Sequence, residues 1–148
     1  MIFSKDIVDN ILKFMVANIE TLLQSAETDY TATIDRAVHF DTVLYSDMAM
    51  PFVLLYEKNT THEMETLQRD KKLFQFVLFI KDSRADLNRL RVNLYGYRDA
   101  IENLIEFNSE LGNSGGVALI SDINMPPVIY DNVNYTGAIE IRFRFETV

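Results

Sequence analysis

The chain has 148 residues, of which 48% are hydrophobic and 24% are charged, a composition typical of a single globular domain with one core. It contains no cysteine, which excludes disulfides, thiolate metal sites and a cysteine nucleophile. Its net charge of −8 disfavours binding to DNA phosphates, which depends on Lys and Arg. Because the apolar runs are short and no secretory leader opens the sequence, we expect a soluble cytoplasmic protein that does not contact membranes.

The first segment predicts an amphipathic helix over residues 4–26. Ser4 is a suitable N-cap, and Asp6 lies in the first turn, where it complements free backbone N–H groups. Apolar residues recur at three- and four-residue steps from Val8 to Leu23. The polar, mixed stretch 27–50 then predicts only a short strand, near residues 37–43.

Two strands follow. The β-branched and aromatic run 52–56 begins after Pro51, where a strand tolerates proline. The second run, 72–80, is almost entirely apolar, which predicts that both of its faces are covered. The polar residues 57–70 between them predict an antiparallel pair joined by a long, mobile excursion.

A second helix is predicted over residues 84–110, with Asp82 and Ser83 as its cap. The glycine-rich segment 112–116 should end it. A short strand is expected at 117–120, after which the segment 125–128, with its proline pair, breaks the strand pattern.

The closing segment 137–146 alternates apolar and charged residues over eight positions, which predicts a strand with one buried face. The buried face would carry Ile139, Ile141, Phe143 and Phe145, and the other face Glu140, Arg142, Arg144 and Glu146. The order α-β-β-α-β-β predicts one α+β domain over residues 1–148, with two long helices on one face of a mostly antiparallel sheet.

No motif in the sequence predicts a catalytic residue, a cofactor or a metal. His62-Glu63-Met64-Glu65 lacks the second histidine of a zinc-protease helix. The glycine-rich segment follows a helix, whereas a phosphate-binding loop precedes one. Four aspartates recur at six-residue steps, but no glycine lies between them to form a calcium loop. They are Asp29, Asp35, Asp41 and Asp47.

The order of elements resembles the tail terminator (tail completion) proteins of long-tailed bacteriophages. The features that carry the resemblance are the N-terminal helix, the strand Pro51-Phe52-Val53-Leu54-Leu55, the long hairpin excursion, the strand that ends in Lys81-Asp82, the long helix and the alternating closing strand. The resemblance covers almost the whole chain and lies in architecture and hydrophobic pattern. The pair Pro126-Pro127 and the segment 122–135 around it depart from that pattern.

The resemblance implies a structural virion protein, assembled in the bacterial cytoplasm, whose ring, usually a hexamer, caps the tail tube and joins it to the head connector. Its partners would be further copies of the chain, the tail tube protein and the connector; DNA would pass through the lumen without sequence-specific binding. Another ring protein of the phage neck remains open. So does a second class, a small-molecule binding or regulatory domain with a pocket between helices and sheet.

Two regions are the predicted contact surfaces of such a ring: the 57–70 excursion and the charged face of the closing strand, where paired charges can fix the orientation of neighbouring subunits. The candidate interface residues are Glu57, Lys58, His62, Glu63, Arg69, Asp70, Glu140, Arg142 and Arg144.

Overall fold

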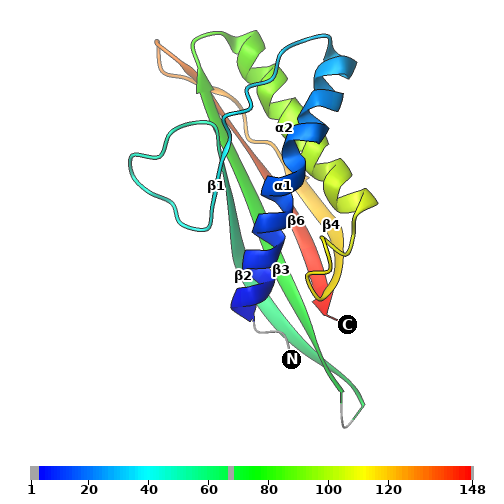
Figure 1. Ribbon diagram of the computed structural model, residues 1–148. Helices are drawn as coiled ribbons and strands as arrows, with labels where there is room; N and C mark the ends of the chain where they lie inside the picture. The colour runs from blue at the N-terminus through cyan, green and yellow to red at the C-terminus, as the bar shows by residue number, and fades with distance from the viewer. Residues whose placement is uncertain (1–3, 67–68, 148) are drawn as a thin grey trace.

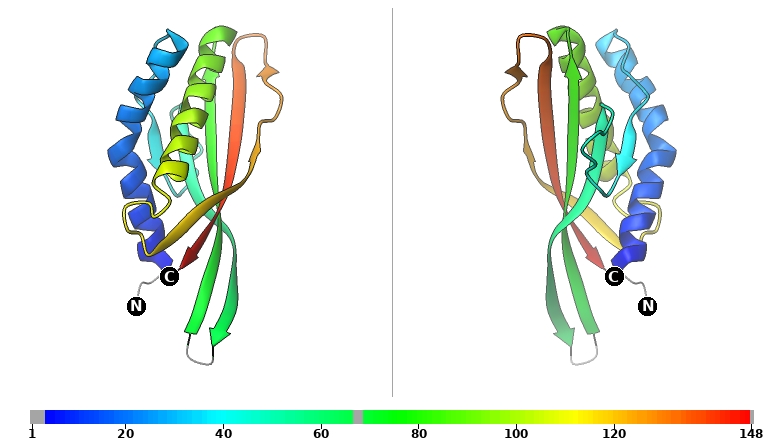
Figure 2. Two further views of the ribbon diagram at one scale, coloured as in Figure 1. Left: turned by 90° about the vertical axis from the view of Figure 1, so that its right-hand side faces the viewer. Right: turned by 90° about the vertical axis from the view of Figure 1, so that its left-hand side faces the viewer.

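The computed structural model describes residues 4–66 and 69–147, and for residues 59, 61–66 and 69–71 it describes the backbone alone. Two helices lie side by side and cover one face of a single sheet (Figures 1 and 2). The fold is therefore α+β, as the sequence predicts. The helices are α1 (Ser4–Tyr30) and α2 (Leu87–Phe107), and the strands are β1 (His39–Asp41), β2 (Phe52–Thr66), β3 (Arg69–Arg84), β4 (Gly116–Asn124), β5 (Ile129–Tyr130) and β6 (Tyr135–Thr147).

The sheet has the strand order β1-β2-β3-β6-β4, and the short β5 pairs with the start of β6. Only β1 and β2 are paired in parallel; every other described pair is antiparallel. The closing strand β6 thus lies inside the sheet, between β3 and β4. The short β1 and the longer β4 lie at its two edges.

The alternation in β6 has the predicted consequence. Its apolar residues are at most 1% exposed, whereas Glu140 and Arg142 are half-buried and Arg144 is exposed. The core between helices and sheet includes the stripe of α1 and four phenylalanines of β3 and β6. Phe74 and Phe76 are stacked with their ring centroids 5.5 Å apart, and Phe76 also contacts Phe143 at 5.4 Å.

A second apolar group lies on the face of the sheet that is turned away from the helices. Val77 pairs with Arg142, so these two residues share a face, yet Val77 is only 2% exposed. Phe52 and Leu54 of β2 are also buried, and the ring of Phe52 lies 6.3 Å from that of Phe79. Much of β3 is therefore buried on both faces, as its apolar run predicts.

The predicted start of α2 is wrong. Asp82 and Ser83 continue β3, because pairing with β6 extends to Arg84 and Tyr135. The helix instead begins at Leu87, and its N-cap is Asp86, whose carboxylate accepts a hydrogen bond from Asn88 N at 3.0 Å. The break at residues 125–128 is confirmed, while β4 and β6 both extend beyond their predicted bounds.

The 57–70 excursion, expected to be a loop, continues both strands. β2 runs to Thr66 and β3 begins at Arg69, with register shifts at Glu57/Asn59 and Met64/Thr66. The prediction failed because these residues are polar, and backbone pairing alone, without an apolar face, makes them a hairpin.

Candidate functional site

The end of the β2–β3 hairpin projects from the domain. Pairing of β3 with β6 stops at Leu73 and Glu146, whereas pairing with β2 continues to Thr66 and Arg69. We call this self-paired end, residues 61–66 and 69–72, the arm. It extends past the helices in all three ribbon views (Figures 1 and 2). It is the part of the sheet most available to another molecule.

Six of the predicted interface residues lie on or beside the arm. Glu57 and Lys58 are exposed at its base, and the Thr60 hydroxyl donates a hydrogen bond to the Glu57 carboxylate. The other four contribute backbone to the arm, while their side chains lie outside the described part of the structure. They are His62, Glu63, Arg69 and Asp70.

The structure brings two predicted residues of β6 together. Arg142 Nη2 donates to Glu140 Oε2 at 3.1 Å, and Arg142 Nη1 lies 3.8 Å from Asp122 Oδ2 on β4. Arg144 is exposed and forms no ion pair within the described residues. The charged face is thus partly neutralised internally, and Arg144 is the charge that remains for a partner.

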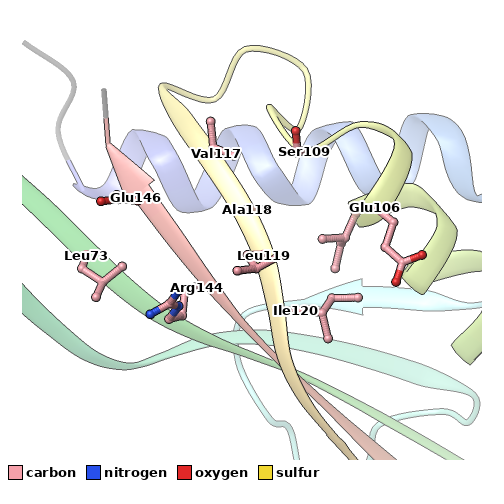
Figure 3. A pocket seen from close by; sticks show the side chains of 10 residues that line it. Leu73, Glu106, Ser109, Val117, Ala118, Leu119, Ile120, Arg144 and Glu146 are labelled. Atoms are coloured by element: carbon pink, nitrogen blue, oxygen red, sulfur yellow. The ribbon is translucent and has the colours of Figure 1, made fainter.

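A groove of about 370 Å³ runs along β4 at one edge of the sheet (Figure 3). We call it the β4 groove. Leu119 lies opposite Arg144 in the register, and both side chains line the groove together with Leu73 of β3. Glu106 and Ser109, near the end of α2, form its other wall. Val117 and Leu119 are large apolar residues that are 44% and 59% exposed.

The opposite edge of the sheet carries a loop, residues 42–51, that bulges beyond β1 (Figure 1). We call it the edge loop. Its exposed apolar side chains are those of Val43, Leu44, Tyr45 and Met50. Neither the edge loop nor the β4 groove was predicted as a contact surface, because exposure of an apolar residue cannot be read from its neighbours in the sequence.

A polar network, which the sequence analysis also missed, lies inside the domain. Asp82 and Asn93 are fully buried, and Asn93 Nδ2 donates to Asp82 Oδ2 at 3.0 Å. Arg84 Nε lies 3.1 Å from both oxygens of Asp82, and Arg84 Nη2 lies 2.8 Å from Asp35 Oδ2. Arg89 also binds Asp35. The network joins the segment after α1 to the end of β3 and to α2.

Charges within this network stabilise one another. Partial burial opposes ionisation of Asp35, but hydrogen bonds from Asn93 and Arg89 and the charge of Arg84 outweigh it, so the pKa of Asp35 is lowered. Burial, together with the nearby carboxylates, raises the pKa of Tyr97, whose hydroxyl donates to Asp35 O at 2.7 Å. Because these groups bind one another, the network reads as a structural junction.

The four evenly spaced aspartates do not form one site. Asp35 belongs to the network, whereas Asp41 accepts hydrogen bonds from Thr42 N and Val43 N at 2.7 and 3.2 Å. Within residues 4–66 and 69–147, no cluster of three His, Asp or Glu side chains is arranged to hold a metal ion. In that same part of the chain, neither helix has the length and apolar character needed to cross a membrane.

No family model matches the chain, and no curated protein matches it in sequence. Among solved structures, a chain described as "Virion of native gene transfer agent (GTA) particle" matches with a TM-score of 0.39 and 11% identity. The match covers 90% of this chain and 93% of that chain.

Proposed function

We propose that the chain is a structural virion protein that forms a ring, a hexamer by the resemblance above, which caps the tail tube of a long-tailed phage and joins it to the head connector. The observation that carries this proposal is the arm. A two-stranded hairpin on its own is only marginally stable in water. A hairpin that leaves the domain and pairs only with itself is therefore suited to packing against another molecule.

Charge supports the same proposal. At −8 the chain repels a phosphate backbone on balance. A ring through which DNA passes must not hold the DNA, and an acidic protein meets that requirement.

The first test is assembly. Light scattering and electron microscopy of the purified chain, alone and with the tail tube protein, should show closed rings and tubes with a ring at one end. A chain that stays monomeric at every concentration and does not bind tubes would contradict the proposal. A terminator should also limit the length of growing tubes, whereas another neck ring protein should not.

The second test removes the arm. Thr61 and Leu73 are paired, so replacing residues 62–72 with Asn-Gly closes the hairpin with a two-residue turn. This variant should keep the thermal stability of the domain, because the removed residues pair only with one another, and it should lose tube binding or ring formation. The matched control inserts Asn-Gly between Asn132 and Val133, in the turn between β5 and β6, and should leave assembly intact.

A further inference from the structure

The described residues expose large apolar side chains at both edges of the sheet. The β4 groove lies at one end of the strand order, and the edge loop follows β1 at the other end. Leu119 in the groove is 59% exposed and Leu44 in the loop is 66% exposed. Exposed apolar patches on ordered elements mark interaction sites.

The edge loop is held at its base. His39 N donates to Pro51 O at 3.2 Å, which closes the two ends of the loop. At its first residues, Asp41 binds two successive backbone N–H groups, and further along Met48 N donates to Tyr45 O at 3.3 Å. The loop therefore presents Leu44 and Tyr45 from an anchored base.

The groove offers the loop an open strand. β4 is paired with β6 on one side; on the other, Ala118 N donates to Ser109 O at 2.6 Å, the one backbone bond reaching that side in the described part of the chain. Beyond Ala118 the strand edge is free for an added extended segment, while Val117 and Leu119 provide apolar contact.

The charges at the two sites are complementary. Arg144 lines the groove and Asp47 lies in the edge loop, and neither has an ion pair among the described residues. The groove also carries Glu106 on its helix wall, so an acidic loop can enter it only with its carboxylate toward Arg144. Such a pair fixes the orientation of a contact more than it adds affinity.

We propose that the edge loop of one copy occupies the β4 groove of the next copy, with Leu44 against Leu119 and Asp47 toward Arg144. Because the two surfaces are different and lie at opposite edges of one sheet, the contact is head-to-tail, and its repetition closes a ring when the rotation between copies permits. The inference rests on the proposed ring function and names the surfaces that would form its lateral contact.

The absence of cysteine makes a clean cross-linking test possible. The variant Leu44→Cys/Leu119→Cys, treated with a short bismaleimide, should give a ladder of cross-linked species that ends at the ring size. Each single variant should remain monomeric in a denaturing gel, since a head-to-tail contact never brings two copies of one residue together. The matched control is Leu44→Cys/Lys13→Cys, with Lys13 exposed on α1, and it should give no ladder.

The outcomes separate the two proposals. If the wild type forms rings but the Leu44→Cys/Leu119→Cys variant gives no ladder, or if the control gives an equal one, the lateral contact is overturned and the ring function stands. Dimers from either single variant would show a symmetric contact and also overturn it. A wild type that never assembles overturns both.

A charge exchange gives an independent measurement. Asp47→Arg and Arg144→Asp should each raise the concentration at which half the chains assemble by about tenfold, equivalent to roughly 1.4 kcal/mol. The double exchange should restore most of that loss, because it recreates the pair with reversed signs. Equal loss in the double variant would show that the two residues do not meet.

Discussion

Asn93 and Asp35 bind each other through two hydrogen bonds of opposite direction. Asp35 N donates to Asn93 Oδ1 at 3.1 Å, and Asn93 Nδ2 donates to Asp35 Oδ2 at 3.0 Å. The same amide also donates to the buried Asp82 carboxylate. One side chain of α2 therefore connects the segment after α1 to the end of β3, which is why a polar residue is fully buried at this position.

Replacing Asn93 with Asp should destabilise the domain strongly at neutral pH. The change removes the donor and places a third carboxylate beside Asp35 and Asp82, and a buried uncompensated charge costs about 3–5 kcal/mol. Asn93→Ala, which only removes hydrogen bonds, should cost about 1–3 kcal/mol. Urea unfolding should show that the gap between the variants narrows as pH falls to about 4.5, where the added acid begins to protonate. A gap that is constant with pH would contradict the placement of Asn93 between the two acids.

The lowered pKa of Asp35 predicts how stability depends on pH. The folded state binds this proton less readily than the unfolded chain, whose Asp has a pKa near 3.8. The stabilisation is therefore complete well above pH 3.8 and is lost as pH falls through the lower folded-state value. The free energy of unfolding, measured from pH 6 to pH 2.5, should fall more steeply for the wild type than for Asp35→Asn.

The control for that experiment is Asp29→Asn, which removes an exposed carboxyl near the end of α1 and leaves the network intact. If it flattened the pH dependence as much as Asp35→Asn does, the effect would not arise from the contacts of Asp35 with Arg84, Arg89 and Asn93.

The elements that sequence predicted well are those whose burial pattern is local. The alternation from Ile139 to Glu146 fixes which face of β6 is covered, because side chains in a strand alternate regardless of what lies above them. The stripe of α1 is predictable for the same reason. By contrast, the extended hairpin depends on pairing between two polar segments, and polar residues give the same signal in a loop and in an uncovered strand.

The network was not predictable from spacing, because Asp35 and Asn93 are 58 positions apart and meet only in the fold. One signal was present. Asn93 lies three residues after Leu90 and four before Tyr97, which are both buried, so it occupies the core-facing stripe of the second helix. A polar residue at such a position needs buried partners, and carboxylates from other segments were the available candidates.

A pair of neighbouring substitutions on β6 tests the two faces directly. Phe143 is 1% exposed and contacts Phe76, so Phe143→Ala should reduce the free energy of unfolding by about 3–5 kcal/mol. Arg144→Ala, one residue away on the exposed face, should change it by no more than about 0.5 kcal/mol. Urea unfolding of both variants measures the difference. Similar losses in the two variants would mean that the strand is not oriented as described.

The last prediction concerns the close approach of α2 to the segment that follows α1. A Cβ built on Gly96 would lie 2.4 Å from Ile34 Cδ1, and Ile34 is itself 1% exposed. Gly96→Ala gains about 1 kcal/mol in helix propensity, but crowding against Ile34 should exceed that gain and make the variant less stable. Ile34→Val removes the crowded Cδ1 and should cost about 0.5–1.5 kcal/mol in the wild type.

In the Gly96→Ala background the same Ile34→Val change should cost less than it does alone, or should stabilise, because the methyl group it deletes occupies the space that the new Cβ requires. Urea unfolding of the four proteins in this double-mutant cycle gives the coupling energy, expected to be about 1 kcal/mol or more. Additive effects would contradict the contact between Gly96 and Ile34. The contact matters for the whole molecule, because Ile34 immediately precedes Asp35, and the position of α2 against this segment sets where the buried carboxylate meets Asn93.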